Sequence, residues 1–348
     1  SLIKAVHFED RILDITLGVF GFKRGQEVTP LDGANEFLSA LVMNKSLEGI
    51  VSEENILLST TCIEATIPFR KNSIPTSHPM IMENRLLKIR NELSLDLQDE
   101  QIYDGIIKAV SLANRDVGGF CVPDPGLFLN DTWKLLPESN VSLRIKEYYS
   151  IKEYRIALQK MEAFFRSVKS ENVYQCYREE PSEEKLAEMI KYAKNNIDTG
   201  RDYIGVKLVG IAVIEAFAEL SGGDAPVSLF MGDIDEKENE TRMEDYLPEV
   251  EITSWSDHNP TVYNLLEYGR SAPSNFDMNN SPLSSYIYKK LGQTRLEALL
   301  KAAKEMFNGT ISYAEFLKQV DADIVSTLVK ACSALAITRS TKINSLLR

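Results

Sequence analysis

Apolar residues recur at steps of three and four along the whole chain, and this periodicity is the feature that most constrains the fold. Side chains spaced in this way lie on one face of an α-helix, where they can pack against a neighbouring helix. Alternation with a period of two is weak and limited to 226–230 and 250–255. The sequence therefore predicts an all-α fold, with its clearest helices over 151–168, 206–220, 296–307 and 324–335.

Several helix boundaries can be predicted from capping residues. Ser52 and Ser182 each precede two glutamates, which is typical of a helix start, because the hydroxyl accepts a first-turn N–H and the carboxylates face the positive end of the helix. Gly222-Gly223 and Asn308-Gly309 follow two of the periodic stretches and predict helix ends. Further breaks rich in Pro, Gly and Asn divide the chain into many helices.

A loop-rich region separates an N-terminal from a C-terminal group of predicted helices. We expect a helical body over 1–232, a loop-rich connection over 233–282 and a C-terminal helical cap over 283–348, an arrangement compatible with one packed domain. The chain has 348 residues, of which 44% are hydrophobic, so it can bury a large core.

Charge and hydropathy exclude several kinds of partner. The net charge of −12, without a dense Lys/Arg run, gives no overall attraction to nucleic acid or to an anionic membrane. The longest apolar stretch, 206–220, contains Lys207, Glu215 and Glu219, so no membrane span is predicted. We therefore expect a soluble protein that binds neither nucleic acid nor membrane.

The cysteines indicate a reducing compartment. All four are far apart and form no Cys-x-x-Cys pair, which is typical of buried free thiols. With no signal peptide visible, a cytoplasmic location is expected. The chain begins at Ser1 rather than methionine, so a targeting segment could precede it, and its content of Asn, Lys and Ser is also compatible with a secreted bacterial effector.

Two N-terminal segments combine charged residues with apolar helical stretches. In 5–15, His7, Asp10, Arg11 and Asp14 are spaced at three and four and are expected on one helical face. In 56–70, Glu64 interrupts an apolar run that ends at Arg70. A carboxylate there is costly to bury unless it is paired, hydrogen-bonded or metal-bound.

A third segment, 106–120, has the same character. It places Asn114, Arg115 and Asp116 at the end of an apolar helix, just before a Gly-Gly break. Between the second and third segments lie His78, which precedes a proline and is expected in an exposed loop, and Arg85. This clustering on consecutive predicted helices predicts one shared polar pocket.

The layout of 1–120 resembles the HD-domain and cyclic-nucleotide phosphodiesterase superfamily. That family is all-helical, with His and Asp on its first helix, a His-Asp pair at the end of an apolar helix, and a final Asp on a later helix. In this sequence Arg11 stands where a metal-binding His is expected, Ile63-Glu64 stands at the His-Asp pair, and Asp116 fits the final Asp. The resemblance implies an HD-like orthogonal helical bundle followed by additional C-terminal helices.

The resemblance also implies a metal-dependent phosphohydrolase or phosphodiesterase acting on a small phosphorylated ligand. In this hypothesis His7 is a general acid, and one divalent ion (Mg, Mn, Fe or Zn) is held by acidic and imidazole groups. Arginines grip the phosphate through bidentate hydrogen bonds. The expected catalytic residues are His7, Glu64 and Asp116, the metal ligands Glu64, Asp116 and His78, and the substrate-binding residues Arg11, Arg70, Arg85, Asn114 and Arg115.

A second hypothesis needs no catalysis. The same residues could be structural: His7 a surface residue, Glu64 paired with Arg70, and Asn114 to Asp116 a hydrogen-bonded helix end. The protein would then be an all-helical scaffold that binds a small ligand or a protein partner. The sequence leaves both hypotheses open.

Overall fold

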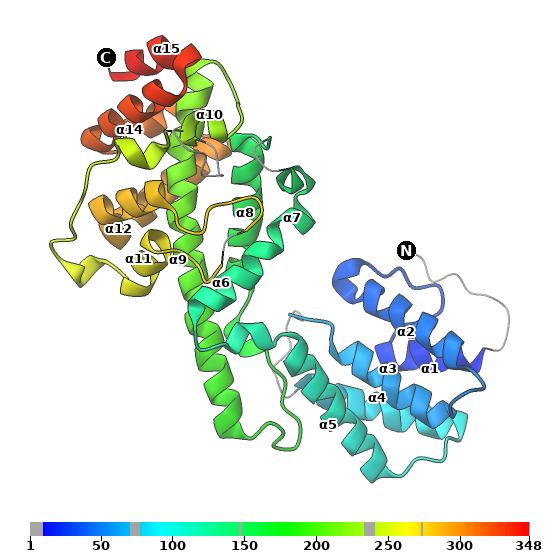
Figure 1. The fold of residues 1–348 in the computed structure, drawn as a ribbon. Coiled ribbons are helices and arrows are strands. Elements are labelled where there is room, and N and C mark those ends of the chain that lie inside the picture. Colours follow the sequence, from blue (N-terminus) through cyan, green and yellow to red (C-terminus); the bar gives the residue numbers. More distant parts are fainter. Residues whose placement is uncertain (1–9, 70–76, 146–147, 233–240, 273, 348) are drawn as a thin grey trace. The chain divides into compact units, whose positions relative to one another are not determined.

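The protein is all-helical in the computed structural model, which describes residues 10–69, 77–145, 148–232, 241–272 and 274–347 (Figure 1). These residues form no strand, and the two weakly alternating stretches contribute only an isolated bridge between Ser150 and Pro226. The predicted all-α fold class is therefore confirmed.

The helices divide into two compact units. Unit 1 comprises Ser1–Val122 and Val168–Lys194, and unit 2 comprises Pro123–Ser167 and Asn195–Arg348. This division differs from the predicted parts, whose boundaries lie near 232 and 282. One boundary instead falls at Lys194, inside the helix α9 (Glu183–Ser221). No proline or glycine stands next to Lys194 in the sequence. A boundary of this kind depends on which helices pack together, so loop composition does not predict it.

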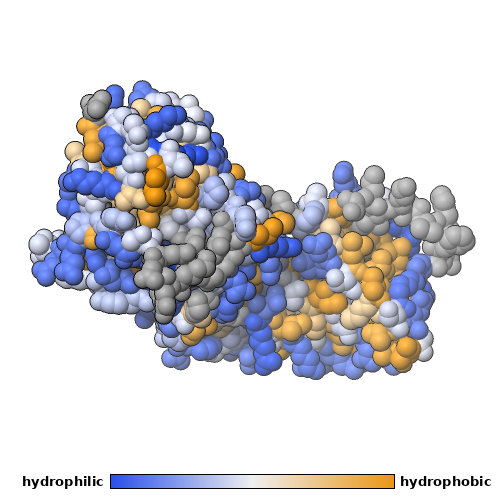
Figure 2. All heavy atoms as spheres, turned by 45° about the horizontal axis from the view of Figure 1, so that its top comes forward, coloured by the Kyte–Doolittle hydropathy of each residue, from blue (hydrophilic) through white to orange (hydrophobic). Residues whose placement is uncertain are grey.

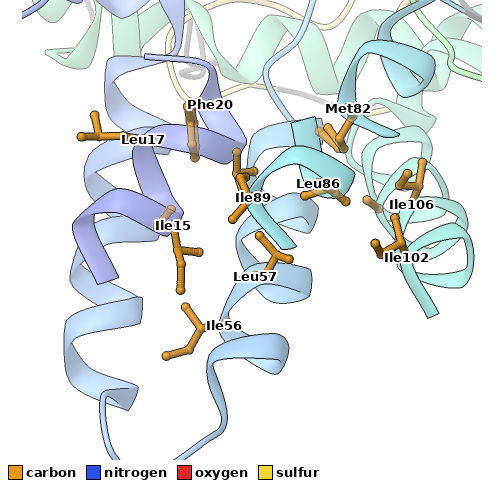
Figure 3. Close-up of a cluster of buried hydrophobic side chains, with 14 of the residues drawn as sticks. Ile15, Leu17, Phe20, Ile56, Leu57, Met82, Leu86, Ile89, Ile102 and Ile106 are labelled. Atoms are coloured by element: carbon orange, nitrogen blue, oxygen red, sulfur yellow. The ribbon is translucent and has the colours of Figure 1, made fainter. Parts of the chain in front are cut away.

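Unit 1 is built around α3, which packs against α1, α2 and α5 and, less extensively, α4. Its core consists mainly of aliphatic side chains that these helices direct toward one another, including Ile15, Leu57, Leu86 and Ile106 (Figure 3). Buried Asn44 adds a polar group to it and donates to the hydroxyls of Thr16 and Thr60 at 2.9 and 2.8 Å. Its helices are α1 (Arg11–Phe20), α2 (Ala34–Leu47), α3 (Glu53–Ala65), α4 (Ser77–Leu93), α5 (Asp99–Asp116) and the first part of α9.

The start of α1 differs from the prediction. Asp10 does not lie on the helical face expected for it but is the N-cap, and its carboxylate accepts the Leu13 N–H at 3.0 Å. The reason is that an aspartate satisfies an unpaired first-turn N–H at this position, which favours it as a cap over a place within the helix. The start of α3 agrees with the prediction, because the Ser52 hydroxyl accepts the Asn55 N–H.

Unit 2 contains the helices that the periodicity predicts most clearly. Long apolar stretches become α8 (Ile151–Ser167), the second part of α9, α12 (Pro282–Phe307) and α14 (Ala322–Leu335). Both α9 and α12 end just before the glycine-containing breaks, as predicted. The shorter helices of unit 2 are α6 (Pro125–Lys134), α7 (Leu136–Ser139), α10 (Ser228–Met231), α11 (Pro260–Glu267), α13 (Tyr313–Leu317) and α15 (Ser340–Asn344).

One break inside α12 is not visible in the periodicity. Gly292 adopts φ 69°, so the helix restarts there, and Asp257 accepts hydrogen bonds from the backbone N–H and the hydroxyl of Thr294. A Cβ at residue 292 would lie 2.5 Å from the Asp257 carboxylate. Glycine is therefore required both for the backbone conformation and for the close approach of the capping carboxylate.

Hydrophilic side chains cover much of the visible face, and hydrophobic ones gather in separate groups (Figure 2). Within the described part of the chain, every helix is too short or too polar to cross a bilayer.

Candidate functional site

Glu64 lies in the last turn of α3 and is 1% exposed, as expected for a residue within an apolar run. Its two carboxylate oxygens contact different partners. Oε2 lies 3.0 Å from Nε2 of His78, and Oε1 accepts a hydrogen bond from Nη1 of Arg85 at 3.3 Å. Both partners come from α4, so the burial cost of the carboxylate is offset by a cation and an imidazole of the neighbouring helix.

His78 is in the second position of α4 and is 6% exposed, which corrects the expectation of an exposed loop residue. The physical reason is that a proline is tolerated in the first turn of a helix, where its missing N–H has no intrahelical partner. The sequence Ser77-His78-Pro79 is thus a helix start. A carboxylate facing Nε2 favours the tautomer that carries hydrogen on Nε2, which leaves Nδ1 able to accept a proton.

Arg85 has donors left beyond its contact with Glu64. Nη1 also donates to the backbone carbonyl of Val19 at the end of α1, at 3.1 Å, and the side chain is 30% exposed. Nε and Nη2 have no hydrogen-bond partner among the residues that the structure describes. A Cβ at Gly21 would lie 2.7 Å from this guanidinium, so the glycine at the end of α1 leaves space for it. Arg85 can therefore offer a pair of N–H groups to an anion.

Two further observations mark the end of α3 as unusual. Phe69, just beyond α3, has φ 51°, a conformation that costs a non-glycine residue of order 1 kcal/mol or more and that clusters at functional sites. Gln175 donates from Nε2 to the Ala65 carbonyl at 2.9 Å, while its buried Oε1 lacks a hydrogen-bond partner in the described part of the chain.

Asn114 holds Gln175 in place. Its Nδ2 donates to the Gln175 carbonyl and its Oδ1 accepts the Gln175 N–H, both at 2.8 Å. Both ends of the Asn114 amide are therefore used within the fold. This does not favour its expected role in substrate binding.

The other predicted site residues that the structure describes do not join this cluster. Arg115 and Asp116 are exposed at the end of α5, without a hydrogen bond or ion pair to any described residue. Arg11 is exposed and forms a salt bridge with Glu53. His7 and Arg70 lie outside the described residues, so their predicted roles stay predictions.

The predicted metal ligands are not assembled. Glu64 and His78 touch, but no group of three or more His, Cys, Asp or Glu side chains within the described ranges could hold a metal ion. Glu64 and His78 instead lie together with Arg85, and the metal-binding role expected for Glu64, Asp116 and His78 stays a prediction.

Sequence reasoning identified all three members of this cluster but not their mutual contacts. The described partners of Glu64 lie 14 and 21 positions away, on α4. The expected pairing of Glu64 with Arg70 stays a prediction, because Arg70 lies outside the described residues. No family model, curated protein or solved structure was found to match the chain.

Proposed function

We propose that the protein is a phosphohydrolase that cleaves a phosphate ester at the Glu64–His78–Arg85 cluster of unit 1. The observation that carries the proposal is the contact between a fully buried carboxylate and a histidine, with an arginine on the other carboxylate oxygen. A carboxylate–imidazole pair is the arrangement that enzymes use to hold a histidine ready for proton transfer.

In this proposal His78 is the general base. Glu64 keeps the hydrogen on Nε2, so Nδ1 accepts a proton from the attacking water as its oxygen bonds to phosphorus. The bond from phosphorus to the leaving oxygen breaks, and that oxygen takes its proton from solvent. This sequence of steps uses no metal ion.

Arg85 supplies the positive charge. Its Nε and Nη2 groups, which have no hydrogen-bond partner in the described ranges, can donate to two phosphoryl oxygens, and these charge-assisted hydrogen bonds strengthen as negative charge develops on the phosphoryl group. Lysine at this position would keep the charge but lose the planar pair of donors.

The test is hydrolysis of bis(4-nitrophenyl) phosphate and 4-nitrophenyl phosphate in the presence of EDTA. We expect His78→Gln to lower kcat/KM by about 100-fold or more, the usual contribution of a general base. His258→Gln is the matched control, since both ring nitrogens of His258 already face backbone carbonyls in unit 2. Arg85→Lys should lower kcat/KM, whereas Arg90→Lys, on the same helix and paired with Asp99, should not.

If the wild type hydrolyses neither substrate above the rate in buffer, or if His78→Gln and His258→Gln are equally active, the hydrolase proposal is wrong.

One observation favours a second function, a non-catalytic scaffold that binds a ligand or a protein. Both oxygens of Glu64 are satisfied inside the protein, as in a purely structural ion cluster. That function predicts binding of inorganic phosphate at Arg85 without turnover.

A further inference from the structure

A second buried charged cluster lies in unit 2 and plays no part in the proposed hydrolysis. Its centre is Asp277, in the loop before α12. The Asp277 Oδ2 accepts hydrogen bonds from Lys207 Nζ at 3.0 Å, from the Tyr154 hydroxyl at 2.8 Å and from the Trp133 indole at 3.0 Å. Burial alone would raise the pKa of Asp277, but Lys207 and Arg270 beside it hold the pKa below its usual value, so it is an anion.

Two cations share this one carboxylate. The side chains of Lys207 and Arg270 are 7% and 0% exposed, and both face Asp277 Oδ2, at 3.0 and 3.9 Å. Burial opposes the charge of Arg270, yet the nearby Tyr203 and Asp277 raise its pKa, so it stays protonated. Its Nε is buried without a hydrogen-bond partner in the described part of the chain. The cluster therefore carries one buried positive charge in excess, which is costly unless an anion offsets it.

Lys207 also lines a cavity of about 80 Å³, large enough for several water molecules or a ligand of similar size. Two of the three donors of its ammonium group are used, by Asp277 and by the Ser281 hydroxyl at 3.0 Å. Asp277, Ser228 and Ser284 provide further polar groups in the wall, while Arg270 lies behind Asp277 and is not part of the lining. The remainder of the lining is largely apolar, with Ile211 and Leu283 among its members.

We propose that this cavity binds a short-chain monocarboxylate, with its carboxylate group paired to Lys207 and its aliphatic chain packed against Ile211 and Leu283. The site is separate from the Glu64–His78–Arg85 cluster and does not depend on the hydrolase proposal.

The charge and the lining together select this class of ligand. One excess cation matches a monovalent anion, whereas a phosphate monoester would bring close to two negative charges into the same buried space. A small number of polar groups in a mainly apolar wall is the usual composition of a small-molecule site and favours a ligand with one polar end.

The experiment is titration calorimetry of the full chain with butyrate, butyramide and inorganic phosphate. We expect saturable binding of butyrate, and none of butyramide, which has the same shape without the charge. Lys207→Met should weaken butyrate binding at least tenfold. Lys289→Met is the matched control, since Lys289 is a largely buried lysine of unit 2 that pairs with Glu267 and does not line the cavity.

Ser228→Leu provides a second variant if Lys207→Met does not fold. Ser228 is half-buried in the cavity wall, so leucine there takes up cavity space while Lys207 and Asp277 are left in place, and butyrate binding should be lost. Equal binding of butyrate and butyramide, unchanged butyrate binding by a folded Ser228→Leu variant, or no butyrate binding by the wild type would overturn the proposal. Binding of phosphate in preference to butyrate would overturn the choice of ligand.

Discussion

Replacement of Glu64 by alanine tests whether the buried cluster stabilises unit 1. The variant leaves His78 and Arg85 without the carboxylate that now accepts from both. Removing one partner of a buried ion pair typically costs about 3–5 kcal/mol. Because the Arg85 side chain is 30% exposed and water can replace part of its lost partner, we expect the low end, about 3 kcal/mol.

The matched control is Glu53→Ala, at the other end of the same helix. Glu53 pairs with Arg11 in an exposed salt bridge, so its loss should cost about 1 kcal/mol or less, including its favourable position at the helix N-terminus. Both tryptophans, Trp133 and Trp255, belong to unit 2, so their fluorescence does not report directly on unit 1. The assay is therefore urea-dependent amide hydrogen exchange of α3 and α5. If Glu64→Ala costs no more than Glu53→Ala, the cluster is not the stabilising feature we describe.

Three further predictions concern other residues. Gly21→Ala should destabilise unit 1 by about 1–2 kcal/mol in the same exchange assay, because residue 21 has φ 68° and the new Cβ would meet the Arg85 guanidinium. Unchanged stability of this variant would show that neither the backbone conformation nor the contact with Arg85 requires glycine. Burial raises the pKa of Asp202 from 3.8 to about 6, although the nearby Arg201 acts to lower it. Between these two pH values the folded state binds more protons than the unfolded state, so the folded protein loses stability as the pH rises through this range. Asp202→Asn should therefore stabilise unit 2 more at pH 7 than at pH 4 in urea unfolding followed by tryptophan fluorescence, and an equal effect at both values would refute this. Burial raises the pKa of the Cys332 thiol, so iodoacetamide should label it only after unfolding, as judged by mass spectrometry; rapid labelling of the native protein would contradict its burial.

The helices could be predicted because their signals are local. In α8, residues such as Tyr154 and Phe165 fall on one face by spacing alone, and the structure buries both. The restart of α12 could not be predicted, because it depends on Asp257, which reaches the helix from 37 positions away to bond Thr294. A pattern that reports one helix face carries no information about such a cap.

The candidate site shows the same difference between local signals, which the sequence contains, and tertiary contacts, which it does not. A carboxylate inside an apolar run indicated that Glu64 needs a partner, whereas Lys207 was considered only as a charge that argues against a membrane span. The partners themselves are tertiary: His78 joins Glu64 through the packing of α3 and α4, and Asp277 joins Lys207 across 70 positions. Sequence alone can thus identify a charge that must be compensated, but not the residue that compensates it.

The most direct test of the central claim is a double-mutant cycle on phosphodiester hydrolysis. The claim is that Glu64 and His78 act as one unit, so kcat/KM should be measured for the wild type, Glu64→Gln, His78→Gln and the double variant, at a temperature where all are folded. Residues that act as a unit have non-additive effects, so the double variant should be no less active than His78→Gln alone. The account would be contradicted if the losses in kcat/KM of the two single variants multiply in the double variant, or if the His78→Gln variant is fully active.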